Sequence, residues 1–139
     1  MLDMLTQLLA RYGQEKLRLK SLGREHAAVE GVREYIIEFH SHNLSLAELA
    51  RIANLSPFHL TRVFARQVGM PPHEFLTQVR VAKAKKLIRS GLSLSDVAAQ
   101  TGFADQSHFI RQFKRLMKIT PGEYLKNSKN VQYAAPPLG

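Results

Sequence analysis

The sequence predicts an all-α fold made of two copies of one small helical module joined by a longer helix. The chain repeats itself once: Leu44 to Ala50 match Leu92 to Ala98 at an offset of 48 residues, and after one extra residue the match continues at an offset of 49. Apolar residues recur at helical spacing, and no segment shows the alternation typical of a strand. Two copies are too few for a solenoid, so each copy is expected to form its own module.

The first 40 residues predict two helices separated by a break. The first helix covers residues 2–20, and the second covers about residues 25–40. The triplet Ser21-Leu22-Gly23 predicts the break between them. The heptad-like apolar row of the first helix consists of Leu2, Leu5, Leu9 and Tyr12. The expected buried stripe of the second helix consists of Val29, Val32, Ile36 and Phe39.

The first copy shows the start and stop signals of two short helices. Ser45 followed by Glu48 predicts a capping box at the start of the first. Asn54 stands at the turn and tolerates a left-handed backbone. Ser56 caps the second helix and Pro57 occupies its first turn, where a missing N–H costs nothing. That helix is expected to end at about residue 68.

The second copy repeats this plan after a connecting helix over about residues 73–89. Either Ser93 or Ser95 starts its first helix, and Gly102 supplies the turn. Asp105 caps a helix that runs to about residue 118. A last short helix follows through residue 125, and the tail from residue 127 is expected to be frayed.

These signals divide the chain into five parts. They are an N-terminal amphipathic helix or linker over residues 1–25, a first subdomain over 26–72, a connecting helix over 73–90, a second subdomain over 91–127 and a flexible tail over 128–139.

Charge is distributed unevenly along the chain. The net charge is +9, yet residues 1–56 hold seven basic and seven acidic side chains, so the whole excess lies in residues 57–139. Such asymmetry indicates a polyanionic partner, although a basic surface without a target is the alternative. The absence of cysteine suits a reducing cytoplasm, and no apolar run approaches the roughly 18 residues needed to cross a bilayer.

A short helix, a tight turn and a second helix form a helix-turn-helix, whose second helix can lie in the DNA major groove. On a helical wheel, the second helix of each copy has a basic, hydrogen-bonding outer face. Arg62 and Arg111 can bond a guanine bidentately, and Gln106 can do so at an adenine. Phe58 or Ile110 can touch a thymine methyl. The expected inner sides consist of Leu60, Val63, Phe64, Gln67 and Val68, and of Phe109, Phe113, Leu116 and Met117.

Each of these assignments has a plainer alternative. Arg62 and Arg111 can be ordinary solvated side chains, although their equivalent positions in two copies favour DNA contact. Phe58 and Ile110 can simply be exposed or pack against a neighbouring helix. The histidines His59 and His108, which recur in register, can cap a helix, touch phosphate or fill space.

A longer motif carries a specific resemblance. Residues 56–64 read Ser-Pro-Phe-His-Leu-Thr-Arg-Val-Phe and are followed by Gly-Met-Pro-Pro at 69–72. Residues 101–109 read Thr-Gly-Phe-Ala-Asp-Gln-Ser-His-Phe, and Thr-Pro-Gly-Glu-Tyr follows at 120–124. Over about residues 30–127 the chain resembles the AraC/XylS family of bacterial transcription regulators.

The resemblance implies two homeodomain-like helix-turn-helix subdomains whose recognition helices enter adjacent major-groove segments of double-stranded DNA. The implied base contacts are Phe58, Thr61, Arg62, Gln106, Ser107, His108, Ile110 and Arg111. The phosphate candidates are His59, Arg66, Lys114 and Arg115. The resemblance also implies transcription activation and, in many members, an N-terminal effector-sensing domain. The first helix is then expected to be the last helix of a sensor that this chain lacks, or a helix that packs back on the DNA-binding core. A fragment of a longer regulator is favoured, and a free-standing small regulator is the competing possibility.

Two other classes of function compete with DNA binding. The first is a helical protein-interaction module with an incidental basic surface, for instance one that contacts RNA polymerase. The second is an enzyme, for which the sequence offers no nucleophile–base pair, glycine-rich phosphate loop or carboxylate pair. We therefore expect a non-enzymatic protein without cofactor, metal site or membrane segment.

Overall fold

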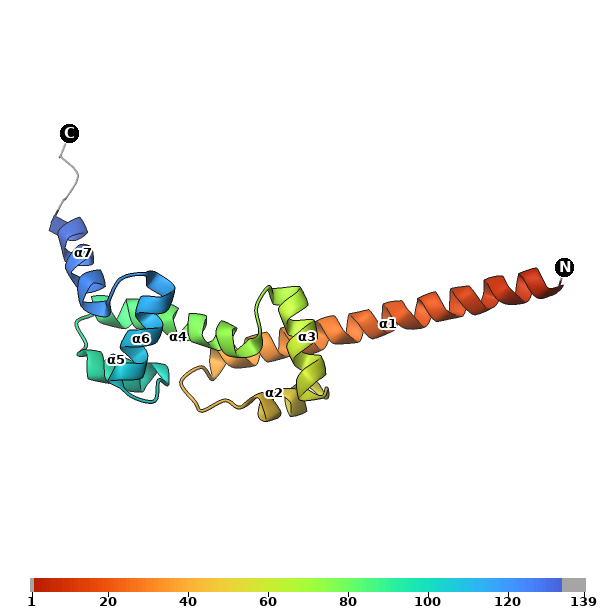
Figure 1. The fold of residues 1–139 in the computed structure, drawn as a ribbon, viewed down its shortest axis with the longest axis horizontal. Helices are drawn as coiled ribbons and strands as arrows, with labels where there is room; N and C mark the ends of the chain where they lie inside the picture. Colours follow the sequence, from red (N-terminus) through yellow and green to blue (C-terminus); the bar gives the residue numbers. More distant parts are fainter. Residues whose placement is uncertain (1, 134–139) are drawn as a thin grey trace, which may run out of the picture. The chain divides into compact units, whose positions relative to one another are not determined.

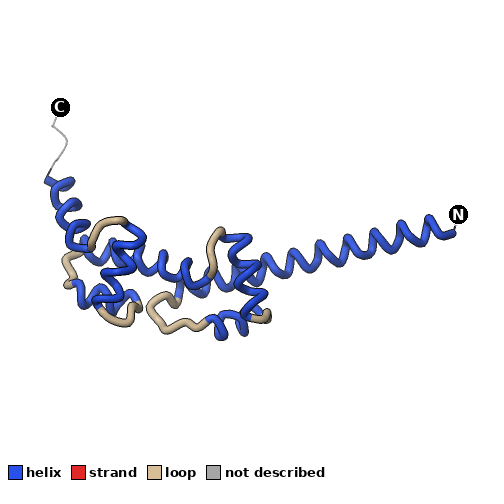
Figure 2. The backbone as a smooth tube through the Cα atoms, in the orientation of Figure 1, coloured by secondary structure: helices blue, strands red, loops and turns tan. Residues whose placement is uncertain are grey.

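Seven helices and no strand form the part of the chain that the computed structural model describes, residues 2–133, with side chains described over 3–129 (Figures 1 and 2). The predicted all-α class is confirmed. The helices are α1 (Leu2–Glu38), α2 (Leu46–Ala53), α3 (Pro57–Val68), α4 (Pro72–Arg89), α5 (Leu94–Thr101), α6 (Gln106–Met117) and α7 (Pro121–Tyr133).

The first helix is longer than the sequence indicated. Helix α1 continues without interruption through Ser21, Leu22 and Gly23, so the predicted break is wrong. An interior glycine costs a helix about 1 kcal/mol relative to alanine, which the neighbouring turns can absorb. Added side chains at Gly13 and Gly23 would meet nothing within 4 Å, so neither glycine is needed for a close contact.

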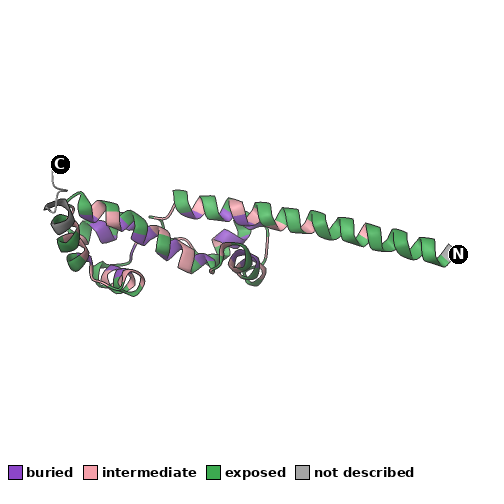
Figure 3. Ribbon diagram, turned by 90° about the horizontal axis from the view of Figure 1, so that it is seen from above, coloured by how far each residue is buried: buried purple, intermediate pink, exposed green. Residues whose placement is uncertain are grey.

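The apolar row near the N-terminus is exposed to solvent. Leu5, Leu9 and Tyr12 are 58%, 64% and 69% exposed, and Figure 3 shows the same exposure along the N-terminal turns of α1. Helix α1 becomes buried only from about Val29 onward. One expectation for the first helix was that it packs back on the helix-turn-helix core. The exposed N-terminal turns do not do so. The side chain of Leu2 lies outside the described residues.

The chain divides into two compact units that interrupt each other in sequence. The first unit comprises Met1–Glu34 and Leu46–Pro72, and the second comprises Tyr35–Ser45 and His73–Gly139. In the first unit α2 packs on α3. Its buried apolar residues are Val29, Val32, Leu49, Ala50, Ala53, Leu60, Val63 and Phe64. Gln67, which the helical wheel placed inside, is exposed.

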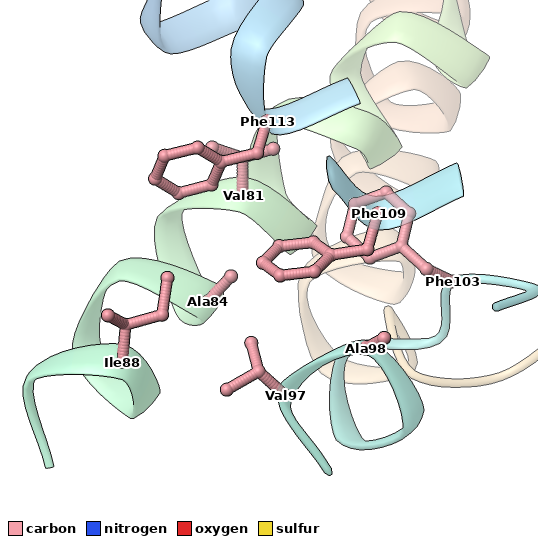
Figure 4. Packing of buried hydrophobic residues seen from close by; sticks show 8 residues of the cluster. All are labelled: Val81, Ala84, Ile88, Val97, Ala98, Phe103, Phe109 and Phe113. Carbon is pink, nitrogen blue, oxygen red and sulfur yellow. The ribbon is translucent and has the colours of Figure 1, made fainter. Parts of the chain in front are cut away.

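The second unit is built around one apolar cluster contributed by α4, α5, α6 and the turn between α5 and α6 (Figure 4). Its members are Val81, Ala84, Ile88, Val97, Ala98, Phe103, Phe109 and Phe113. The rings of Phe109 and Phe113 lie 5.7 Å apart in an edge-on arrangement, which aromatic pairs favour. The cluster fixes the inner face of α6 and leaves the opposite face outward.

The turns follow the predicted backbone chemistry. Asn54 has a φ of 54°, and Gly102 has a φ of 86°. Ser93 rather than Ser95 caps α5, because its side chain accepts a hydrogen bond from the Asp96 N–H. Helix α7 continues to Tyr133, so the fraying expected from residue 127 is wrong up to that point, and the rest of the tail lies outside the described residues.

Candidate nucleic-acid interface

Helix α3 of the first unit is fixed at both ends by its own sequence. The Ser56 hydroxyl accepts a hydrogen bond from the His59 N–H at 3.1 Å, and Pro57 starts the helix. Gly69 ends it in the left-handed conformation. Leu60, Val63 and Phe64 are buried. The opposite face of the helix is thereby turned outward.

That outward face carries Phe58 and Arg62. Phe58 is 73% exposed, and the Arg62 guanidinium lies 5.7 Å from the centre of its ring. This cation–π contact orients an otherwise mobile guanidinium. Thr61 is half-buried and its hydroxyl donates to the Pro57 carbonyl at 2.9 Å, so it is engaged within its own helix.

Helix α6 of the second unit repeats this design. Asp105 caps it by accepting a hydrogen bond from the His108 N–H at 2.7 Å. Phe109 and Phe113 anchor the inner face. The exposed side chains of the opposite face are Gln106, Ser107, Arg111, Lys114 and Arg115.

Two of the predicted base-contact residues of α6, His108 and Ile110, pack against the second unit instead of lying fully exposed. Ile110 is half-buried and packs against the apolar cluster of the second unit. The His108 ring packs edge-on against Phe103 at 5.5 Å, and its buried Nδ1 has no hydrogen-bond partner among the described residues. Ile110 and His108 are therefore less available to DNA than their exposed neighbours Gln106, Ser107 and Arg111.

Three of the four phosphate candidates are engaged by carboxylates. His59 Nε2 lies 3.0 Å from Glu25 Oε1, and Arg66 Nη2 lies 3.8 Å from Glu25 Oε2. Arg115 donates to both carboxylate oxygens of Glu74, at 2.9 and 3.0 Å. This bond and the charge of Glu74 raise the pKa of Arg115 above its ordinary value. Lys114 is exposed on α6.

Sequence reasoning missed Glu25 and Glu74. Both lie on helices that precede a module, Glu25 on α1 and Glu74 in the first turn of α4. They stand 41 residues from Arg66 and Arg115 respectively. The only available signal was that the two glutamates are themselves 49 residues apart, which is the offset of the repeat.

Among residues 2–133, no three His, Cys, Asp or Glu side chains gather closely enough to hold a metal ion. Within the same range, no helix combines the length and apolar character that crossing a membrane requires.

Solved structures of other proteins share this fold. The C-terminal domain of AraT, a response regulator from Geobacillus stearothermophilus, superposes with a TM-score of 0.69 at 30% identity, covering 72% of this chain and 84% of that one. The C-terminal domain of the two-component response regulator yesN from Fusobacterium nucleatum gives a TM-score of 0.66 at 33% identity, covering 69% and 95%. The DNA-binding domain of AdpA in complex with a target DNA gives a TM-score of 0.70 at 24% identity, covering 80% and 97%, which supports the fold alone.

Sequence relatives agree with the structural ones. Residues 49–127 match the model of a helix-turn-helix domain family. The chain is 35% identical over 107 residues to the HTH-type transcriptional regulator YbfI of Bacillus subtilis, covering 77% of this chain and 38% of the relative. It is 36% identical over 102 residues to the bifunctional transcriptional activator/DNA repair enzyme AdaA of the same organism, covering 73% and 48%. The chain thus spans less than half the length of these relatives. The match over more than half of the chain shows that it belongs to the AraC-type family of helix-turn-helix transcription regulators.

Proposed function

We propose that the chain is a sequence-specific double-stranded DNA-binding part of a transcription regulator, with α3 and α6 as its recognition helices. One observation carries the proposal: each recognition helix buries an apolar face and presents an exposed arginine on the opposite face at equivalent positions, Arg62 and Arg111. Arginine at such a position recognises guanine through its O6 and N7 atoms.

The exposed side chains differ between the two helices. The first recognition helix offers Phe58 and Arg62, which suit a thymine methyl beside a guanine. The second offers Gln106, Ser107 and Arg111, which are exposed hydrogen-bonding groups. Two different reading surfaces in one chain favour an asymmetric site, which a single chain can recognise without a second copy.

Replacing Arg111 with alanine is expected to remove sequence information from one half of the recognised site. Loss of a bidentate guanine contact costs about 1–3 kcal/mol of discrimination. Selection of bound duplexes from a random DNA pool, run with the wild-type chain and the variant, measures this effect. Arg62→Ala is expected to affect the other half.

The matched control is Lys129→Ala, which removes an exposed positive charge from α7. It is expected to keep the whole motif. If the wild-type chain enriches no motif, or if Arg111→Ala weakens all positions equally, base reading by α6 is wrong.

Affinity for the selected duplex is expected to fall steeply with salt. A protein that contacts about 6–10 phosphates loses roughly a thousandfold or more in affinity between 50 and 200 mM salt. Fluorescence anisotropy over that range measures the slope. A helical protein-interaction module with an incidental basic surface, the competing function, predicts a shallow slope and no loss on changing Arg62 or Arg111.

The regulator to which this chain belongs is proposed to activate transcription. The relative AdaA is described as a transcriptional activator. Because the relatives are longer than this chain, we propose that an effector-sensing domain accompanies it. An activator role would make RNA polymerase a second partner. Comparing transcription from a promoter bearing the selected site, with and without the protein, tests the activator role directly.

A further inference from the structure

The same arginine of each recognition helix is held by a carboxylate from the helix that precedes its module. Arg66 of α3 pairs with Glu25 of α1, and Arg115 of α6 pairs with Glu74 of α4. The arginines are 49 residues apart and so are equivalent in the repeat. The two copies of the module therefore contain the same kind of interhelical ion pair at equivalent positions.

The pair in the second unit has the stronger geometry. Arg115 Nη1 and Nη2 donate to Glu74 Oε1 and Oε2 at 2.9 and 3.0 Å, and Arg115 Nε donates to Gln112 Oε1 at 2.9 Å. A two-pronged pair fixes direction as well as distance. Glu74 lies in the first turn of α4 and Arg115 in the last turn of α6, where the helix dipoles favour each charge.

In the first unit the carboxylate is more enclosed and contacts two side chains of α3. The Glu25 side chain is 16% exposed, and its two oxygens face His59 and Arg66. Both basic groups belong to α3, one near its start and one in its last turn. Glu25 therefore joins α1 to α3 through a hydrogen bond with His59, and the partly exposed Arg66 adds a longer ion pair at 3.8 Å.

We propose that Glu25 and Glu74 are positioning residues for DNA binding, each fixing the direction of its recognition helix through Arg66 or Arg115, and that these arginines are not phosphate contacts. The inference rests on the proposed function. An arginine in a two-pronged pair has to leave its carboxylate before it binds phosphate, so exchanging partners gains little. Releasing the helix instead moves the base-reading side chains of α3 or α6.

The direction of change on removing the carboxylate separates the two roles. If Arg115 contacts phosphate, Glu74→Gln frees the guanidinium and removes a repulsive charge, so DNA binding becomes tighter. If Glu74 positions α6, the same substitution weakens binding. Arg115→Lys adds a second criterion, since lysine still binds phosphate as a point charge but cannot form the two-pronged pair.

The experiment measures the affinity of Glu74→Gln, Arg115→Lys and Arg115→Gln for the duplex selected by the wild-type chain. We expect each variant to bind about threefold more weakly, the loss typical of a partly exposed pair. The salt slope is expected to stay unchanged, whereas loss of one phosphate contact lowers it by about 0.9. Circular dichroism at the assay temperature verifies that every variant is folded.

Glu123→Gln is the matched control, because Glu123 is an exposed first-turn carboxylate of α7 in the same unit. It removes one negative charge without breaking the pair, and its binding is expected to equal the wild-type value or exceed it slightly. Repeating the duplex selection with Glu74→Gln and Glu25→Gln is expected to blur opposite halves of the motif.

Tighter binding by Glu74→Gln overturns the inference, and so does wild-type affinity of Arg115→Lys combined with a lower salt slope for Arg115→Gln. If the wild-type chain selects a duplex and Glu74→Gln binds it equally tightly, the inference is wrong but the proposed function stands. If the wild-type chain selects no duplex, the proposed function fails and the inference fails with it.

Discussion

Replacing Arg80 with methionine is expected to lower the free energy of unfolding of the second unit by about 3 kcal/mol. Arg80 lies on α4 and is only 8% exposed. Its Nε donates to the His40 carbonyl and its Nη2 to the His42 carbonyl, both at 2.8 Å, while its guanidinium lies 5.8 Å from the centre of the Phe103 ring. Burial lowers the pKa of Arg80 from its ordinary value. The two carbonyls and the Phe103 ring replace part of the water that the buried guanidinium has lost.

The loss is large because methionine fills much of the same space but leaves two carbonyls without their donor. A hydrogen bond from a charged group contributes about 1.5–3 kcal/mol, and leaving a buried acceptor unpaired costs a similar amount. Urea unfolding followed by circular dichroism measures the change. Lys83→Met, an exposed position on the same helix, is the control and should change stability by less than about 0.5 kcal/mol. Equal effects of the two substitutions would contradict the role given to Arg80.

Replacing Gly102 with alanine is expected to destabilise the second unit by about 2–4 kcal/mol. Gly102 ends α5 with a φ of 86°, a conformation that costs other residues about 1–2 kcal/mol. A Cβ atom there would lie 2.8 Å from the His40 carbonyl oxygen and 2.9 Å from the Ser41 Cα. Because both neighbours are backbone atoms, a helix end or the segment after α1 has to move.

Gly91→Ala separates these two contributions. Gly91 belongs to the same unit and has a φ of 95°, but an added Cβ would meet nothing within 4 Å. It is therefore expected to show the backbone cost alone, about 1–2 kcal/mol. Urea unfolding of both variants yields the difference. If Gly102→Ala is no more destabilising than Gly91→Ala, the close approach of residues 40–41 is unimportant for stability.

Much of the local structure follows from short stretches of sequence. Ser56 and Asp105 cap the recognition helices as expected, and Asn54 and Gly102 turn the chain with a positive φ. These outcomes were predictable because each depends on bonds within a few residues. The same is true of the buried faces of α3 and α6, which helical spacing reveals.

Local signals misled where neighbouring turns outweighed them. Gly23 follows a serine and a leucine in an otherwise helical pattern, and the triplet resembles a helix end. The structure continues the helix through it, because a single glycine costs less than ending and restarting a helix. For Ile110 the sequence left both DNA contact and packing on a neighbouring helix open, because its place near the edge of the outer face fits either, and the structure shows it partly buried against the cluster of the second unit.

By itself, the sequence determined the helical class, the doubled module, the caps and the exposed outer faces of α3 and α6, because their causes are local or periodic. The tertiary structure alone decided which charged side chains are available. Phosphate contact was expected of Arg66, Arg115 and His59 because they are basic side chains on α3 and α6. In the structure each lies beside a carboxylate, Glu25 or Glu74, from a helix far away in the sequence. Arg80 likewise holds the segment after α1 through two backbone carbonyls. A charged side chain does not encode its partner, since the energy of an ion pair depends on distance and burial, which only the packed chain supplies.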